Sequence, residues 1–513
     1  MPESRGLLTL SNELLKDVLD CIEADPDRTV NIDRRAYLSV ESFRLPSLPE
    51  PSRAQDIGNF RLVCRRFAEI AIPYQFAKLA TRFSKNGLER LDKICSHSHL
   101  AKHTRKFSYL VPYFYVEGRE QIEQLLESRG ARHRFLDPSL FRKKADDQRR
   151  ILCTKEDARI LGKAMAAFVS LQHVQILRLQ DEADRMLLDM MEGSELPRPA
   201  MLDLKWTPAC IHATSTIAQA LLHSRSPFSR FSGPMMNSQS ALVIKDRIPQ
   251  TVSLLASRLT CLELHFDDSE ALNERMRAAS ELFKTVFMAA ENLQAVHVGF
   301  PSRSPLDLGL EEVFHGVQWE KLRAFGIQSW RLDADEIVQL ARRHRTVLRG
   351  LRLRDVQLRE GSMWKDVLAM LRSEMEQLEW VSLRRVDYAK HFDELWADCM
   401  EIVDGSLEGS ESDNEDDFPA HFSVAGSDND QEDGIDFDSE DDHSLADTDQ
   451  GPDANEIALS PNTTASLPFC TCSRSSDPAS ADDLGDNGIF VFYQQRKMWE
   501  QWVIGRCPEH SCT

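Results

Sequence analysis

The stretch LRGLRL, at residues 348–353, has leucine at its first, fourth and sixth positions. Five other segments have apolar residues at the same spacing, and an alternating apolar pattern is typical of a short β-strand with one buried face. These segments are Leu171/Val174/Ile176, Leu259/Leu262/Leu264, Leu293/Val296/Val298, Leu322/Phe325/Ile327 and Leu378/Val381/Leu383. The segments from Leu259 onward start 34, 29, 26 and 30 residues apart. This regular spacing predicts a repeated structural unit.

The segments between these strands have the apolar periodicity of helices, as in Ala271–Ala290, Asp333–His344 and Ser362–Met375. One strand and one helix per unit predict an α/β fold, a strand–helix solenoid over residues 161–403. A non-repetitive α/β domain with chance matches is the alternative. Residues 177–259 fit the pattern poorly, so we expect a degenerate repeat near Met201–Trp206 and a loop at Ser224–Ser240.

Side chains between the apolar positions of a strand point to its opposite face. In the last two units Arg352, Arg354, Trp380 and Arg384 take such positions, and neighbouring strands would bring them into one patch. Arginines bind carboxylates and phosphates through paired hydrogen bonds. The patch therefore predicts a site for an acidic or phosphorylated protein substrate. The alternative is that these arginines pair with local acids such as Asp355 and Glu379.

Two N-terminal segments predict amphipathic helices. The first, LLTLSNELLKDVLDCI at residues 7–22, has Ser11 as a helix cap. The second segment is IGNFRLVCRRFAEIAIPYQF at residues 57–76, and the helix in it is expected to end at Pro73. Prolines between the two segments favour a loop there.

These segments resemble an F-box, in particular its fungal form. The chain has Leu10-Ser11 where an F-box begins with Leu-Pro, and the connection between the helices is longer than usual. The resemblance implies a substrate-recruiting subunit of a ubiquitin ligase, which binds a Skp-type adaptor and through it a cullin. It also agrees with a leucine-rich-repeat substrate domain. The implied adaptor contacts are Leu10, Leu14, Leu15, Val18, Leu19, Phe60, Leu62, Val63, Cys64 and Phe67.

The acidic residues are concentrated near the C-terminus. The formal net charge is −20, but residues 404–453 contain nineteen Asp or Glu and no Lys or Arg, so the rest of the chain is near −1. That balance disfavours nucleic-acid binding, and no apolar run is long enough to predict a membrane span. The scattered cysteines favour reduced thiols in the cytoplasm or nucleus.

The sequence predicts no enzyme and no cofactor, because it contains none of the common nucleotide-binding, zinc-protease or nucleophile motifs. Two other functions stay open: a repeat scaffold whose N-terminal helices only cap the repeats, and an enzyme with a site on the concave face. Cys470, Cys472, Cys507, His510 and Cys512 could supply zinc ligands, although free thiols are the simpler interpretation. The cluster His97, His99 and His103 is expected to be solvated.

The predicted domains follow from these patterns. They are an F-box at residues 7–80 with an insertion at about 26–56, a helical connector at 81–160, the repeats at 161–403, a disordered acidic linker at 404–487 and an aromatic segment at 488–513. We expect the aromatic segment to pack on the repeats, because so many aromatic side chains are costly to leave in water.

Overall fold

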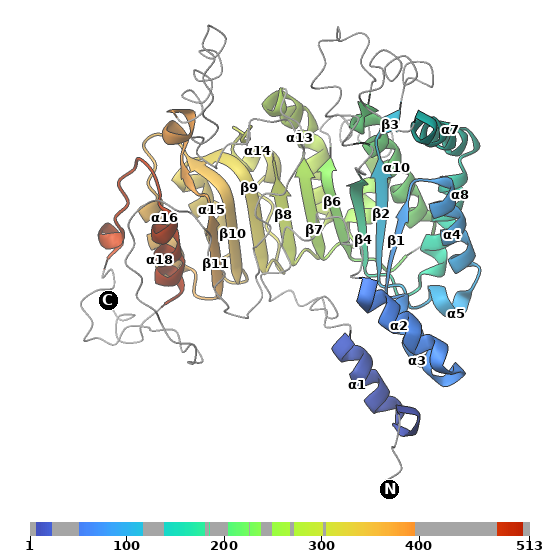
Figure 1. Ribbon diagram of the computed structural model, residues 1–513. Helices are drawn as coiled ribbons and strands as arrows, with labels where there is room; N and C mark the ends of the chain where they lie inside the picture. The colour runs from blue at the N-terminus through green and yellow to red at the C-terminus, as the bar shows by residue number, and fades with distance from the viewer. Residues whose placement is uncertain are drawn as a thin grey trace, which may run out of the picture.

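The structure, a computed structural model, describes residues 7–22, 51–115, 138–179, 184, 204–224, 226–236, 249–266, 271–300, 304–394 and 480–505. These ranges form a mixed α/β fold built on a long parallel sheet (Figure 1). The predicted α/β class is confirmed. Most of the predicted insertion and most of the acidic linker lie outside the described residues, as do the five cysteine and histidine residues considered as zinc ligands. The end of the insertion, expected to be loop, is described and begins the helix at Pro51–Val63.

The main sheet has the order β1-β2-β4-β6-β7-β8-β9-β10-β11, and every neighbouring pair in it is parallel. The short strand β12 extends the edge beside β10, and β3 pairs with β5 in a separate antiparallel sheet. The strands are β1 (Lys78–Arg82), β2 (Lys106–Pro112), β3 (Phe114–Tyr115), β4 (His173–Leu179), β5 (Leu204–Lys205), β6 (Arg230–Met236), β7 (Cys261–Phe266), β8 (Ala295–Gly299), β9 (Ala324–Leu332), β10 (Gly350–Leu358), β11 (Trp380–Arg384) and β12 (Asp387–Tyr388).

The helices that follow the strands contact one another in chain order, from α4 and α8 to α16 and α18, and so form one layer. The helices are α1 (Asn12–Ile22), α2 (Pro51–Val63), α3 (Arg65–Gln75), α4 (Lys85–Cys95), α5 (Ser98–Ala101), α7 (Pro138–Thr154), α8 (Glu156–Ala167), α10 (Trp206–Ser224), α12 (Pro249–Ala256), α13 (Leu272–Ala289), α14 (Leu310–Phe314), α15 (Ala334–Arg343), α16 (Trp364–Glu374) and α18 (Tyr493–Ile504), with the 3₁₀ turns η1 (Leu7–Thr9) and η7 (Ala481–Leu484). In these ranges no helix is both long and apolar enough to cross a bilayer.

All six strands expected from the apolar spacing are present, as β4 and β7 to β11. The poorly fitting region corrects two expectations. Residues 230–236, expected to be a loop, form β6 between β4 and β7, and the supposed repeat near residue 204 forms β5 outside the main sheet. The register aligns Phe231 with Leu262 and Gly233 with Leu264. The glycine at the sixth position explains why the apolar spacing did not reveal this strand.

The sheet also begins earlier than expected. The stretch 81–160, expected to be a helical connector, contains β2, which joins β1 to β4. Phe107 and Tyr109 of β2 align with Val174 and Ile176 of β4, so this strand presents the same apolar positions to the helices. The repeated unit therefore extends back to β1, beside the N-terminal helices.

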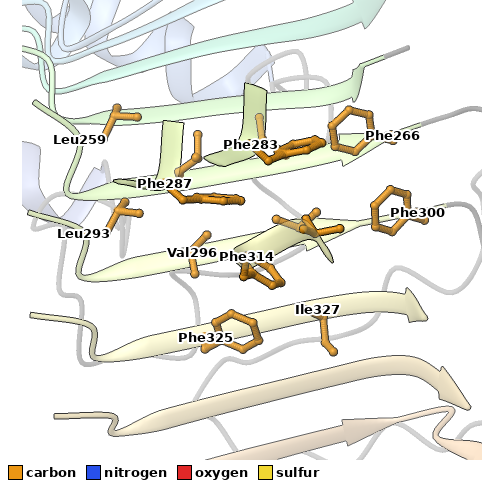
Figure 2. Close-up of a cluster of buried hydrophobic side chains, with 14 of the residues drawn as sticks. Leu259, Phe266, Phe283, Phe287, Leu293, Val296, Phe300, Phe314, Phe325 and Ile327 are labelled. Atoms are coloured by element: carbon orange, nitrogen blue, oxygen red, sulfur yellow. The ribbon is translucent and has the colours of Figure 1, made fainter. Parts of the chain in front are cut away.

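The core lies between the strands and the helix layer (Figure 2). Phe283, on α13, packs its ring edge against Phe266 of β7 with centroids 5.8 Å apart. Phe266 in turn stacks on Phe300, which follows β8, at 5.4 Å. Further along, Phe314 of α14 meets Phe325 of β9 at 5.2 Å. Rings therefore bridge successive units, so each unit is packed mainly by its neighbours.

Among the tryptophans whose side chains the structure describes, four are completely buried, and each satisfies its indole N–H with a backbone carbonyl. Trp319 donates to Phe287, Trp330 to Leu308, Trp364 to Asp387 and Trp499 to Leu484, over distances of 2.6 to 3.2 Å. These bonds leave no indole donor unpaired in the core, where a buried donor without an acceptor would be costly.

Three consecutive strands have a left-handed residue at the same register. Ser329, Asp355 and Arg385 have φ values of 58°, 51° and 49°, and they follow the paired residues Gln328, Arg354 and Arg384. A non-glycine side chain is strained in this region. The bend places the following residues, Trp330, Val356 and Val386, in the buried core.

Replacing Ser329 with glycine should therefore stabilise the fold. Ser329 is fully buried and its hydroxyl has no hydrogen-bond partner among the described residues. Ser329→Gly removes both the left-handed strain and the orphan hydroxyl, so we expect the free energy of unfolding to rise by about 1 kcal/mol. Urea unfolding of the variant, with Ser329→Val as the opposite case, measures this. A clear loss of stability in Ser329→Gly would show that the bend does not strain the chain.

Residues 480–505 close the C-terminal end of the sheet, as Figure 1 shows for α18 beside β11 and α16. Glu500, nearly buried, accepts a hydrogen bond of 2.5 Å from the backbone N–H of Leu383 in β11. Arg372 of α16 donates to the Trp502 and Gly505 carbonyls and lies over the Trp502 ring. The expected packing of the aromatic segment is confirmed for Trp499 and Trp502, whereas Phe492 and Tyr493 are 62% and 61% exposed.

The cap begins before the aromatic segment. Asp486 accepts hydrogen bonds from the Lys365 backbone and the Tyr388 hydroxyl, and Leu484 is completely buried. Residues 480–487, which the sequence analysis assigned to the acidic linker, thus belong to the folded cap.

Removing the Glu500 carboxylate should weaken the end of the sheet. Glu500→Ala leaves the Leu383 N–H without this acceptor, so we expect the free energy of unfolding to fall by about 1–3 kcal/mol. The exposed neighbour Gln501 gives the matched control, Gln501→Ala, which should unfold like the wild type. Equal stability of both variants in urea would contradict a role for Glu500 in closing the edge.

Candidate functional site

The N-terminal helices form a small unit with a core of its own. Its buried side chains stack closely, and the rings of Phe60 and Phe67 lie 4.5 Å apart. This core consists of Leu15, Leu19, Ile57, Phe60, Phe67 and Ala71. The stretch expected to form one helix is in fact α2 and α3, which are separated at Cys64 by an extended residue, and Pro73 lies inside α3.

Polar contacts join α3 to the start of α1. The guanidinium of Arg66 donates to the Asn12 side chain at 2.8 Å and to the Leu10 carbonyl at 2.6 Å. Tyr74 donates to Asp20 at 2.8 Å. Ser11 caps α1 as expected, accepting from the Leu14 N–H at 3.4 Å. Segments more than fifty residues apart are therefore held in one arrangement.

The ten residues predicted to contact an adaptor divide into two groups. Leu15, Leu19, Phe60 and Phe67 are buried in the unit's own core, which corrects their expected role as contacts. The other six are at least partly exposed: Leu10, Leu14, Val18, Leu62, Val63 and Cys64. Among these, Leu62 is 84% exposed and Val63 55% exposed. Such exposure of large apolar side chains indicates an interaction surface.

A shallow groove runs along α1. Its volume is about 480 Å³, and its lining consists of Leu10, Leu14, Asp17, Val18, Cys21 and Ile22. Asp17 is the only charged residue in that lining, so the groove is almost entirely apolar. Apolar grooves of this kind are filled by apolar side chains of a partner, as in other helix-mediated interfaces.

The sheet face opposite the helix layer carries a row of polar side chains. Ser108 donates to Gln175 at 2.8 Å, and the next strands continue with Ser232, Glu263 and His297 at the same register. All five are buried. Buried polar side chains need hydrogen-bond partners. The register supplies them for the pairs Ser108–Gln175 and Ser232–Glu263.

The centre of this row is a buried ion pair. Glu263 accepts from Arg230 at 2.7 Å and from the Ser232 hydroxyl at 2.5 Å, and Ser232 lies 2.8 Å from Nε2 of His173. Burial, followed by the charge of Arg230, holds the pKa of His173 well below its usual value. His173 is therefore neutral at physiological pH, and the single negative charge on Glu263 balances Arg230.

Toward the C-terminal strands this face becomes basic. His265 and His297 lie near Arg352 and Arg354 of β10. Burial and then Arg178 lower the pKa of His265 to about 4, and burial and then Arg352 lower that of His297. Both imidazoles are thus neutral, so the positive charge of this region resides on the arginines.

The predicted substrate patch is assembled but mostly covered. The register pairs Arg354 with Arg384 and places Arg352 one step away, as expected. However, Arg352 and Arg354 are 2% and 6% exposed and have interaction partners. Trp380 is also buried, with its ring against Gly350, where a Cβ would come within 2.1 Å of it. Ile504 of α18 packs on this tryptophan's cluster. Only Arg384 is partly exposed.

The acids considered as partners of the patch, Asp355 and Glu379, bind arginines that lie next to it. Arg385 forms a double hydrogen bond with Asp355, and Arg349 pairs with Glu379. Elsewhere in the described ranges no group of three His, Cys, Asp or Glu is arranged to hold a metal ion. His97 and His99 are exposed, in line with solvated side chains.

Comparisons with known proteins do not assign the chain to a family. No family model matches the sequence, and no curated protein matches it. The function is therefore inferred from the chain's own surfaces: the apolar unit at the N-terminus and the faces and ends of the sheet.

The buried ion pair should be important for stability. Glu263→Ala leaves Arg230 buried without its carboxylate, so we expect the free energy of unfolding to fall by about 3–5 kcal/mol. The control is Glu281→Ala on the exposed side of α13, which should change little. Urea unfolding measures both. A loss below about 1 kcal/mol in Glu263→Ala would mean that Arg230 finds another partner at little cost.

Proposed function

We propose that this chain is an F-box protein, the substrate-recruiting subunit of a Skp–cullin–F-box ubiquitin ligase in the cytoplasm or nucleus. The observation that carries the proposal is the N-terminal unit, where the apolar groove on α1 and the exposed Leu62 and Val63 lie on helices too small to cover them. An adaptor that packs on these side chains would bury them. In this proposal the chain has no catalytic chemistry and no cofactor.

The alternative, a repeat scaffold whose N-terminal helices cap the sheet, is less well supported. A capping helix shares its apolar core with the repeat that it covers. The core of α1–α3 is instead a separate cluster from the core of the strand–helix units. This separation favours a unit that binds another protein. The strand–helix units would then act as a leucine-rich-repeat-like domain that recruits the substrate.

Capture by a Skp-type adaptor tests the proposal. Leu14→Asp combined with Val63→Asp should abolish co-purification with the adaptor, because each substitution puts an unpaired charge into the apolar interface. Both side chains are at least half exposed in the free chain, so the double variant should fold normally. Its thermal melting curve, compared with that of the wild type, checks this.

The matched control is Lys16→Asp, an exposed polar position on α1 that lies outside the groove lining. This variant should bind like the wild type. Adaptor binding that is unchanged in the folded double variant would overturn the F-box proposal. If the wild type fails to bind and deletion of residues 1–76 lowers the melting temperature, the capping role is supported instead.

A further inference from the structure

Exposed large apolar side chains gather at only two places in the described part of the chain. One is the N-terminal unit; the other is the loop before α18 together with the first residue of that helix, where Ile489, Phe492 and Tyr493 are 58%, 62% and 61% exposed. The remaining ones, Leu140, Val169, Leu254 and Met288, are isolated in the sequence. Three such side chains within five residues indicate a second interaction surface. We call residues 489–493 the aromatic loop.

The aromatic loop is held rigidly at the C-terminal end of the sheet. The Asn487 side chain accepts hydrogen bonds from the Ile489 and Phe490 N–H groups, and Asp387 of β12 accepts from the Val491 N–H at 3.2 Å. Phe490 also packs on His391 and on Phe492. Exposed apolar side chains on a fixed backbone lose little entropy on binding, which favours recognition.

Positive charge borders the loop. Arg496 of α18 lies over the Tyr493 ring at 5.7 Å and makes no ion pair with any described residue. Burial lowers the pKa of Arg496, the nearby Asp387 carboxylate opposes this and Arg385 adds to it, so this guanidinium is partly removed from water. The neighbouring carboxylates are already engaged, Asp355 by Arg385 and Asp387 by His391. A partly buried guanidinium that forms no ion pair with a described residue favours an anionic partner.

We propose that the aromatic loop and Arg496 form a docking surface for a peptide segment that carries a carboxylate beside a large apolar side chain. The apolar side chain would pack on Phe492 and Tyr493, and the carboxylate would bind Arg496. This surface would recognise the substrate of the proposed ligase subunit, so the inference rests on the proposed function. It moves the acidic-substrate site from the buried Arg352 and Arg354 to the surface of the cap that covers the C-terminal end of the sheet.

The chain itself supplies a suitable probe. Residues 431–443, QEDGIDFDSEDDH, place Ile435 and Phe437 among acidic residues. The described chain leaves this end of the sheet at Glu394 and returns to it at Ser480, so the acidic region is attached at the same end of the sheet as the docking surface. A tethered copy would compete with an added peptide. The receptor in the test is therefore the full chain with Ile435→Ser and Phe437→Ser.

Fluorescence anisotropy of the labelled 431–443 peptide tests the proposal. At low salt it should bind the receptor, and Phe492→Ser with Tyr493→Ser should weaken binding at least tenfold. Arg496→Gln should weaken it too and reduce its dependence on salt. The matched control is Val169→Ser, an equally exposed apolar position elsewhere, which should bind like the unchanged receptor.

A peptide with serine at positions 435 and 437 separates docking from charge attraction, because its charge is unchanged. It should bind at least tenfold more weakly. Equal binding of the two peptides, no binding at low salt, or unchanged affinity in the Phe492/Tyr493 variant would each overturn the proposal. Adaptor capture is measured separately through α1 and Val63, so failure of one proposal is distinguishable from failure of the other.

Discussion

The whole fold depends on hydrogen bonding between neighbouring parallel strands. The backbone N–H and C=O groups along each edge of a strand stay unpaired unless another strand lies beside it. Each strand of the main sheet pairs only with the strands beside it, and each helix covers only the adjacent part of the apolar face. No single strand–helix unit can therefore be stable alone. At the two ends of the sheet the outer strand has an unpaired edge that must be covered. At the C-terminal end the side chain of Glu500 takes the place of a strand by accepting the Leu383 N–H.

The two faces of the sheet are stabilised by different interactions. The helix side is held by aromatic side chains that reach across units, whereas the opposite side is held by hydrogen bonds that pass from strand to strand through Ser232 and Glu263. A parallel sheet usually carries apolar residues on both faces. Here the second face is polar but buried, and its balance of charge depends on Arg230 and Glu263. This division leaves the exposed apolar surfaces at the ends of the molecule.

Much of the fold could be predicted from sequence because the buried positions of each strand repeat. The six strands found in this way each have a large apolar residue at the sixth position of the pattern. Strand β6 was missed because Gly233 stands at that position. The left-handed bend at Ser329, Asp355 and Arg385 contains no glycine, so nothing in the sequence signals it. Alternation predicted correctly that Arg352 and Arg354 share a face, but it cannot tell whether that face is covered. The same limit applies to α1, where periodicity does not separate the buried Leu15 from the exposed Leu14.

The position of the cap in the chain has a consequence for synthesis. Leu383 and Glu500 are 117 positions apart in sequence although they touch in the fold. Ribosomes add about 5–20 residues per second, so roughly 6–23 s separate the appearance of the last long strand from that of the carboxylate that covers it. During that interval the nascent sheet has an unprotected edge that can pair with another chain. The yield of correctly folded protein in the cell should therefore depend on elongation speed and on chaperones that shield strand edges, even when the finished molecule is stable.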